Sequence, residues 1–195
     1  GEPGLAVTTL TGRTGRPLVV IDVQNDVVAQ AWERDRTVAA IAATVDAARA
    51  AGVPVVWVQH SEDGALEIGS DGWQIVPELQ PADGEPTIRK RYRSSFEDTE
   101  LEDVLARLGA GELLLCGAES NHCVRHTWHA ALERGYDVLL VSDAHTCWEG
   151  DWGDLHVEGE PIVDEQNRNA TDYRLPGRRS DVVSSAALVA DLAGG

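Results

Sequence analysis

Short, almost continuously apolar stretches recur along the chain, and turn-forming or charged residues separate them. The run PLVVIDV at residues 17–23 is rich in β-branched side chains, which is typical of a strand buried on both faces of a parallel sheet. Similar runs predict six strands, at residues 17–23, 53–59, 86–90, 113–116, 136–142 and 181–184. We expect these segments to form the centre of the fold.

Segments with helical spacing lie between the apolar runs. In residues 35–51 the apolar side chains fall on one face of a helix that Asp35 can cap and Gly52 can end. Residues 95–109 are predicted to be a loop that leads into a helix, with Leu101, Val104, Leu105 and Leu108 on its apolar face, and helical patterns cover residues 121–135, 161–169 and 185–192. Because strands and helices alternate, we predict an α/β fold with three layers, in which helices cover both faces of a mostly parallel sheet of about six strands.

Length and composition favour a single domain. A chain of 195 residues with 43% hydrophobic and 25% charged residues is ordinary for one globular domain. Residues 1–16 are rich in Gly and Thr, so we expect a flexible N-terminal lead-in before one domain at residues 17–195. No apolar run is long enough to predict a membrane span. The sequence contains no Met, so we expect the initiating end to be missing.

The charge and the cysteines limit the partners and the compartment. The formal net charge of −17 argues against nucleic acid or an anionic membrane as a partner and would attract a cationic ligand. A solvated acidic surface explains the same charge without any function. Cys116, Cys123 and Cys147 are an odd number of cysteines without a CxxC spacing, which indicates reduced thiols in a cytoplasmic protein.

One stretch combines a predicted strand with a candidate nucleophile. In residues 113–135 an apolar run stops at Gly117, passes through a turn of small and polar residues, and continues as a helical pattern. This order places Cys123 in the first turn of a helix, where unpaired backbone N–H groups and the helix dipole favour a thiolate over a thiol. The alternative is a small buried hydrophobe, which is the usual environment of a free cysteine.

Two further polar residues are predicted near the ends of other strands. Asp22 lies inside an apolar run, where an unpaired carboxylate is costly and needs a partner or a chemical role; it could also be a turn or capping residue. Lys90 falls at the carboxyl end of the third strand, although it could be a solvated lysine at a sheet edge. Because the carboxyl ends of parallel strands open onto one crevice, we expect Asp22, Lys90 and Cys123 to meet there.

Two residues near this crevice allow two interpretations each. Trp73 lies in a long loop at residues 61–85 and could form a pocket wall or pin the loop to the domain. Glu119 lies in the turn before Cys123 and could point into the site or cap the helix together with Ser120. The sequence leaves both alternatives open.

Three histidines follow the turn at helical spacing. His122, His126 and His129 could suggest a metal-binding face. However, the apolar stripe of the same helix includes Trp128 and Ala131, and His126 and His129 each lie about 200° from a member of this stripe. We therefore expect these two histidines to face away from the core and the helix to bind no metal.

Four segments carry a resemblance to a known family. They are VVIDVQND at residues 19–26, KRYRSSFEDTEL at 90–101, CGAESNHCV at 116–124 and RGYDVLLVSDAHT at 134–146. In these segments the chain resembles the isochorismatase-like cysteine hydrolases, the superfamily that contains nicotinamidase, N-carbamoylsarcosine amidase and ureidoacrylate hydrolase. The segments occur in the family's order and nearly its spacing, and the resemblance covers most of residues 17–150. It implies the isochorismatase-like fold, with its Rossmann-like topology.

The resemblance implies roles for particular residues. Asp22, Lys90 and Cys123 take the positions of the family's Asp-Lys-Cys triad. The family also tends to have a cis peptide bond before the cysteine, which would fall between Ala118 and Glu119. Its use would be to aim the backbone N–H groups of Glu119 and Cys123 at one point, as an oxyanion hole.

The same resemblance, and a departure from it, indicate the reaction. Metal-dependent nicotinamidases carry an Asp and several His residues after the second strand, whereas this chain has only His60 there, so we expect no metal and no cofactor. The presence of Cys123 favours cleavage of a non-peptide C–N bond, in an amide, ureido compound or lactam, through a thioester. The alternatives are hydrolysis of a vinyl ether with Asp22 as the acid, and a non-catalytic binding protein on a hydrolase scaffold.

The remaining expectations concern the pocket and the partners. We expect the substrate to be a small molecule, and the acidic chain makes a cationic substrate conceivable. Relatives in the superfamily are often dimers or tetramers, so we expect a homo-oligomer. The residues expected to line the substrate pocket are Trp32, His60, Trp73, Tyr92, Glu119 and Trp148.

Overall fold

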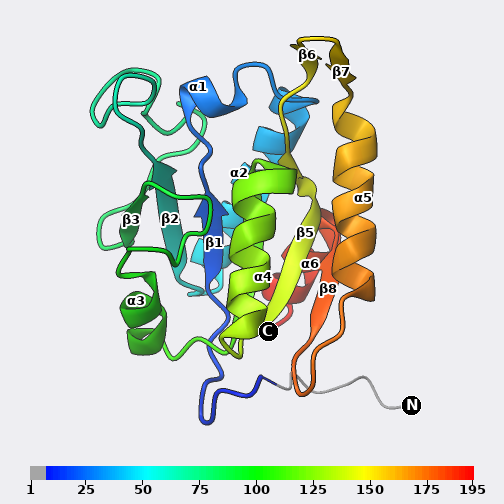
Figure 1. Ribbon diagram of the computed structural model, residues 1–195. Coiled ribbons are helices and arrows are strands. Elements are labelled where there is room, and N and C mark those ends of the chain that lie inside the picture. Colours follow the sequence, from blue (N-terminus) through cyan, green and yellow to red (C-terminus); the bar gives the residue numbers. More distant parts are fainter. Residues whose placement is uncertain (1–7) are drawn as a thin grey trace.

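A six-stranded sheet forms the centre of the computed structural model, which describes residues 8–195 (Figure 1). Its strands follow the order β3-β2-β1-β4-β5-β8, and every neighbouring pair is parallel. The strands are β1 (Leu18–Ile21), β2 (Val55–His60), β3 (Thr87–Lys90), β4 (Glu112–Ala118), β5 (Asp137–Thr146) and β8 (Ser180–Val183). The predicted three-layer α/β fold is confirmed.

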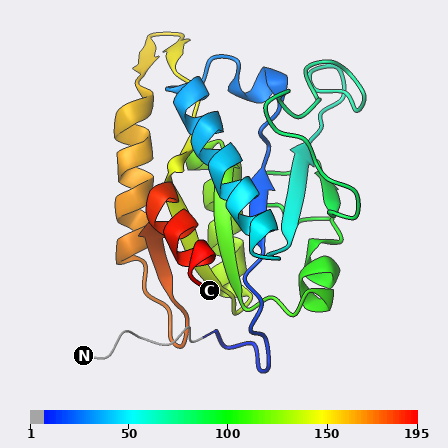
Figure 2. The ribbon, with the colours of Figure 1, turned by 180° about the vertical axis from the view of Figure 1, so that it is seen from behind.

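Helices cover both faces of this sheet. On one face lie α2 (Arg34–Ala50) and α6 (Ser185–Ala193), which Figure 2 shows in front of the strands. On the other face lie the helices α3 (Leu101–Arg107), α4 (Arg125–Glu133) and α5 (Gly159–Asp172). No helix within residues 8–195 is at once long and apolar enough to cross a lipid bilayer.

The alternation of side chains along β1 explains why this strand is apolar throughout. Leu18 and Val20 belong to the core cluster under α2 and α6, whereas Val19 and Ile21 belong to the cluster under α3 and α4. All four are at most 1% exposed. Because successive side chains of a strand point to opposite faces, a central strand between two helical layers must be apolar at every position.

One glycine lets the ends of two strands approach closely. Gly117 pairs with Ile21 in the register between β4 and β1, and its φ is +124°. A Cβ atom at this position would lie 2.0 Å from the Ile21 carbonyl oxygen, so only glycine fits here. The close approach brings the turn after β4 against the end of β1, where Asp22 lies.

The structure differs from the sequence-based prediction at several element ends. The helix α2 begins at Arg34, so Asp35 lies inside it; Glu33 precedes the helix in a left-handed conformation and makes no side-chain cap. A short helix, α1 (Asn25–Val28), follows β1. An antiparallel hairpin of β6 (Gly150–Trp152) and β7 (Leu155–Val157) lies in a segment for which no strand was predicted. Three-residue strands are too short to show a hydrophobic period.

The predicted N-terminal lead-in is only partly within the described residues. Residues 1–7 lie outside them. Beyond that point, Thr8 Oγ1 donates a hydrogen bond to the Gly135 carbonyl at 2.6 Å, and the Gly15 amide donates to the Gly109 carbonyl at 2.8 Å. These contacts hold the second part of the predicted lead-in against the domain.

Candidate active site

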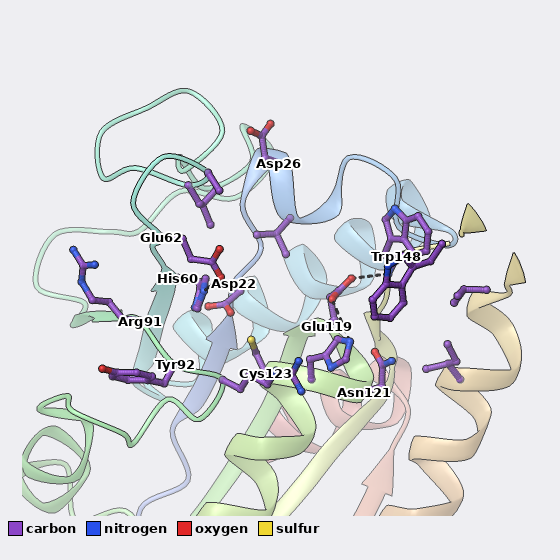
Figure 3. A pocket seen from close by; sticks show the side chains of 18 of the residues that line it. Asp22, Asp26, His60, Glu62, Arg91, Tyr92, Glu119, Asn121, Cys123 and Trp148 are labelled. Carbon is purple, nitrogen blue, oxygen red and sulfur yellow. Dashed lines mark hydrogen bonds and ion pairs between the residues drawn. The ribbon is translucent and has the colours of Figure 1, made fainter. Parts of the chain in front are cut away.

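The ends of four parallel strands bring the candidate residues together, and Figure 3 shows Asp22, His60 and Cys123 among them. Asp22 follows β1, His60 ends β2, Lys90 ends β3, and Cys123 lies in the turn after β4. Because the four strands are neighbours in the sheet and run in the same direction, their carboxyl ends open onto one crevice. The side chains therefore meet although the residues are far apart in the sequence.

Asp22 is a buried carboxylate with one paired and one unpaired oxygen. It is 1% exposed, and its Oδ2 lies 2.9 Å from the Lys90 ammonium nitrogen. Its Oδ1 is also buried and has no hydrogen-bond partner among the described residues, although the Cys123 sulfur lies within 4.8 Å of the carboxylate. An unpaired oxygen on a buried acid is costly in a resting protein, but it is what a general base requires.

Lys90 is the only lysine in the sequence, and it lies at the centre of the site. Its ammonium nitrogen is 2.9 Å from Asp22 Oδ2, from His60 Nδ1 and from the Tyr92 carbonyl oxygen, and 3.2 Å from Cys123 Sγ. An ammonium group has three N–H donors. Four acceptors therefore compete for three N–H groups. Lys90 can direct its hydrogen bonds to the Asp22 carboxylate or to the Cys123 sulfur, whichever carries the negative charge.

Two residues that sequence reasoning missed hold His60. Because the Lys90 ammonium can only donate, His60 Nδ1 accepts, and the ring proton lies on Nε2, which donates to Glu62 Oε1 at 2.9 Å. The Gln24 side chain binds the His60 backbone through both its groups, accepting from the amide at 2.8 Å and donating to the carbonyl at 2.9 Å. The only sequence signal was the position of Gln24 inside the VVIDVQND segment.

Cys123 lies in a wide helical turn, not in the first turn of a regular α-helix. A single π-helical turn, η1 (Ser120–Val124), connects β4 to α4. Burial and the negative charge of Asp22 raise the pKa of the Cys123 thiol to about 12, and together they outweigh the opposing effect of Lys90. The expectation that this position favours a thiolate is therefore wrong, because desolvation by the surrounding fold is larger than the effect of a helix terminus.

Burial also raises the pKa of the Asp22 carboxyl, although the Lys90 ammonium opposes this shift. Asp22 and Lys90 lie in ion-pair contact at 2.9 Å, and beside them the raised pKa of Cys123 keeps its thiol neutral. The proton must leave the sulfur before the sulfur can attack a carbonyl carbon. A carboxylate with an elevated pKa and an unpaired oxygen is the nearby group that can accept it.

The turn between β4 and Cys123 has the predicted backbone form. The peptide bond between Ala118 and Glu119 is cis, as the resemblance implied. The Glu119 side chain makes no cap of the following helical turn. Its Oε1 instead accepts a hydrogen bond of 2.9 Å from the backbone amide of Trp148, and Figure 3 shows it pointing toward the cavity. Of the two interpretations of Glu119, the structure supports the one in which it faces the site.

A second polar cluster, the Ser120 chain, lies beneath the same turn. Ser120 Oγ lies 2.6 Å from His145 Nδ1, His145 Nε2 lies 2.8 Å from Asn167 Oδ1, and the Asn167 amide donates to the Ser142 carbonyl at 3.0 Å. Burial lowers the pKa of His145, which keeps its ring neutral. The chain of hydrogen bonds ties the turn that carries Cys123 to β5 and α5. Only the structure reveals it.

A cavity of about 920 Å³ opens above Asp22 and Cys123, which is within the size range of small-molecule sites. Four of the six residues expected to line the pocket do line it. These four are His60, Tyr92, Glu119 and Trp148.

Comparison with known proteins now identifies the family. A profile of the isochorismatase domain matches residues 17–158. The chain belongs to the isochorismatase family. Its fold matches that of an isochorismatase from Pseudomonas putida KT2440, with a TM-score of 0.80 and 27% identity over 95% of this chain and 93% of the other. A cysteine hydrolase from Pseudomonas syringae shares the fold, with a TM-score of 0.81 over 98% of this chain and 99% of the other, at 20% identity.

Two curated relatives are named as hydrolases. A streptothricin hydrolase from Streptomyces noursei is 37% identical, in an alignment that covers 74% of this chain and 60% of that protein. A ureidoacrylate amidohydrolase from Methylobacterium radiotolerans is 29% identical, in an alignment that covers 65% of this chain and 65% of that protein. The chain therefore spans somewhat less than two thirds of the length of these relatives.

In this member of the isochorismatase family, two predicted pocket residues do not line the cavity. Trp73 is 8% exposed, its carbonyl accepts hydrogen bonds from Gln24 and Gln59, and the Arg89 guanidinium lies over its ring. It pins the long loop to the domain, which is the other interpretation that the sequence allowed. Trp32 packs against Gly159 at the start of α5, and a Cβ on this glycine would clash with it.

The geometry also bears on metal binding. Ligand atoms of Asp22, His60 and Cys123 lie within 4.8 Å of one another, and within residues 8–195 this is the one group of three that could hold a metal ion. The Lys90 ammonium contacts all three of these side chains, so a metal ion bound to them would lie next to an existing positive charge. His126 instead binds the His122 carbonyl through Nδ1.

Proposed function

We propose that this chain is a cysteine hydrolase that cleaves a non-peptide C–N bond in a small amide, ureido compound or lactam. The observation that carries the proposal is the position of Lys90, whose ammonium nitrogen lies 2.9 Å from the Asp22 carboxylate and 3.2 Å from the Cys123 sulfur. The names of two relatives, a streptothricin hydrolase and a ureidoacrylate amidohydrolase, support the same class of reaction. Asp22, Lys90 and Cys123 would carry it.

In the first step, Asp22 takes the proton of the Cys123 thiol and the sulfur attacks the carbonyl carbon of the substrate. The unpaired Oδ1 of Asp22 is the natural acceptor for this proton. Lys90 remains an ammonium ion and stabilises the negative charge as it moves from the carboxylate to the sulfur. The backbone N–H groups of Glu119 and Cys123 would bind the oxyanion that forms on the substrate.

In the second step, the protonated Asp22 gives its proton to the departing nitrogen, the C–N bond breaks, and the acyl group remains on Cys123 as a thioester. Asp22 then takes a proton from water, the resulting hydroxide attacks the thioester carbon, and the proton returns to the sulfur as the acid is released. One carboxylate thus acts as base and acid in turn. Its raised pKa suits both tasks, because the protonated and ionised forms are then closer in free energy near neutral pH.

The test is a screen of amides, ureas and lactams for release of ammonia or amine by the purified chain and by a Cys123→Ala variant. We expect the variant to lose turnover by at least about 10³-fold while its thermal unfolding remains cooperative. Retention of more than a few per cent of the activity would reject the thioester route. Inactivation by iodoacetamide that substrate prevents would further separate this reaction from vinyl ether hydrolysis, in which Cys123 has no role.

The assembly state remains a separate prediction. We expect a homodimer or homotetramer, as many members of the superfamily form, and sedimentation velocity at several protein concentrations measures this directly. A monomer at all concentrations would reject the prediction without affecting the proposed chemistry, since Asp22, Lys90 and Cys123 all come from one chain.

A further inference from the structure

Large apolar side chains are exposed at few places in the described residues, and most of these places surround the cavity. Ile68, Tyr92, Trp152 and Leu155 are 45%, 54%, 77% and 58% exposed. Three of these four, all except Ile68, line the cavity above Cys123. Single exposed apolar residues need no explanation, but a concentration of them at one pocket indicates a surface that a ligand covers.

The β6–β7 hairpin presents two of these side chains together. Trp152 and Leu155 are directly paired across the two strands, so their side chains project from the same face of the hairpin. The hairpin stands above the carboxyl end of the sheet, next to the start of α5 (Figure 1). At its base, Gly150 lies against the Trp148 ring, where an added Cβ would be 2.7 Å from the ring. The hairpin thus continues the wall that Trp148 begins.

Trp148 forms a fixed part of this wall. Its backbone amide donates to Glu119 Oε1 at 2.9 Å, and its indole nitrogen donates to Gln30 Oε1 at 3.0 Å. The protein already pairs both of its N–H groups, so Trp148 offers only the apolar surface of its ring to a ligand. Val157 from β7 and Ile162 from α5 complete the same side of the cavity.

Several charged residues that line the cavity are paired within the protein. Glu62 binds the His60 ring, Glu119 binds the Trp148 amide, and Arg91 lies 3.2 Å from Asp63. A cationic group on a substrate would have to compete with these contacts for Glu62 or Glu119, although not for Asp26 at the edge of the cavity. The apolar wall has no such competitor, because nothing within the described residues covers Trp152 or Leu155.

We propose that Trp148, Trp152, Leu155, Val157 and Ile162 form a subsite for an aryl or branched alkyl group that the substrate carries several bonds from its scissile carbonyl. This inference rests on the proposed C–N hydrolase function and names the substrate class within it. The cavity volume of about 920 Å³ supports it, since a small amide would fill only the part next to Cys123.

The experiment compares two matched series of amides, one that lengthens by methylene and phenyl groups and one that lengthens by aminoalkyl groups. In the wild type we expect kcat/KM to rise by about 10- to 100-fold along the apolar series, as is usual for apolar groups in hydrophobic pockets. Trp152→Ala should remove most of this rise, lowering kcat/KM for the longest apolar amide more than for the smallest, while Trp152→Phe should keep most of it.

Ile68→Ala provides the matched control, because Ile68 is also exposed but does not line the cavity. It should leave both series unchanged. The subsite is rejected if the rise along the apolar series survives in a Trp152→Ala/Leu155→Ala variant, if that variant lowers every substrate equally, or if the aminoalkyl series is preferred. It is also rejected if the variant changes the sedimentation coefficient but not the rise, since the hairpin would then contact a second copy of the chain.

A binding measurement separates failure of the subsite from failure of the proposed function. Calorimetric titration of the Cys123→Ala variant with the longest apolar amide requires no turnover. If the wild type hydrolyses none of the compounds but Trp152→Ala weakens this binding about tenfold or more, the reaction is wrong and the subsite stands. If hydrolysis occurs and neither binding nor kcat/KM depends on Trp152, the reaction stands and the subsite is wrong.

Discussion

Two polar clusters lie on either side of the turn that carries Cys123, and they are satisfied to very different degrees. In the Ser120 chain, each of the hydrogen-bonding groups that links Ser120, His145 and Asn167 has a partner at 2.6–3.0 Å. In the cluster of Asp22, Lys90 and Cys123, one buried carboxylate oxygen is unpaired and four acceptors surround an ammonium group.

Under the proposed function, this difference separates the cluster that performs the chemistry from the cluster that positions it. A fully paired buried network fixes one geometry, because any change in protonation or rotamer forces its hydrogen bonds to rearrange. A cluster with an unpaired carboxylate oxygen can accept a proton without losing an existing hydrogen bond. Ser120 and Cys123 lie in the same helical turn. The hydrogen bonds of the Ser120 chain therefore fix the backbone that carries Cys123.

A substitution of Lys90 should have the greatest effect, because it disrupts the cluster of Asp22, Lys90 and Cys123. Lys90→Met removes the one cation within residues 8–195 that contacts both Asp22 and Cys123, and we expect hydrolysis to fall by about 10³-fold or more. Because it leaves an unpaired buried carboxylate, it should also lower the free energy of unfolding by about 3–5 kcal/mol in urea titrations. The double variant Asp22→Asn/Lys90→Met should recover part of this stability but none of the activity. Equal instability of the two variants would contradict the buried ion pair.

Asp22→Asn should lower the rate of hydrolysis but also lower the pKa of the Cys123 thiol. Hydrolysis should fall by about 10³-fold, because no base remains to take the thiol proton. Yet the negative charge of Asp22 helps to raise the pKa of Cys123 to about 12, and its removal leaves Lys90 beside the sulfur. The thiol pKa should therefore fall, and one unit of decrease gives about tenfold more thiolate at a given pH below it.

The measurement is the rate of carbamidomethylation of Cys123 at pH 8, followed by mass spectrometry. We expect Asp22→Asn to react faster than the wild type and Lys90→Met to react more slowly. Cys116 is fully buried and serves as an internal control that should not react in any folded variant. Slower alkylation of Asp22→Asn would mean that Asp22 activates the resting thiol instead of suppressing its ionisation.

A substitution in the Ser120 chain should have the smallest effect, and this effect should appear in the pH dependence of kcat. His145 is neutral because burial lowers its pKa from 6.5, and its Nδ1 accepts the Ser120 hydroxyl proton. Protonation would turn this acceptor into a donor, so the Ser120 hydroxyl would have to accept the hydrogen bond instead of donating it. Asp143 on β5 acts on the ring through its charge, whereas η1 and α5 present the uncharged Ser120 and Asn167.

Asn167→Asp places a carboxylate against His145 Nε2, which should raise the pKa of this ring. The protonated fraction then grows at a higher pH, so the fall in kcat on acidification should begin at a higher pH than in the wild type. Asn169→Asp makes the same chemical change two residues along α5 and should leave the pH profile in place. A uniform loss of kcat in Asn167→Asp without a shift in pH would show that the Ser120 chain acts only on stability.

Much of the fold and of the candidate site could be predicted from local patterns. The apolar runs located the strands of the sheet, and strand ends in a parallel sheet meet at one edge, so the convergence of Asp22, Lys90 and Cys123 was predictable. The hairpin at residues 150–157 was missed, because its strands are short and exposed and so carry no hydrophobic period.

Hydrophobic periodicity and motif spacing were enough to predict the six strands of the sheet along the chain, the family, and which side chains gather at the sheet edge. Only the tertiary structure decided that the Cys123 thiol is neutral, that Glu62 and Gln24 hold His60, and that Trp148 forms a cavity wall while Trp73 does not. These properties depend on desolvation and on contacts between distant segments, and neither is encoded in any single stretch of the chain.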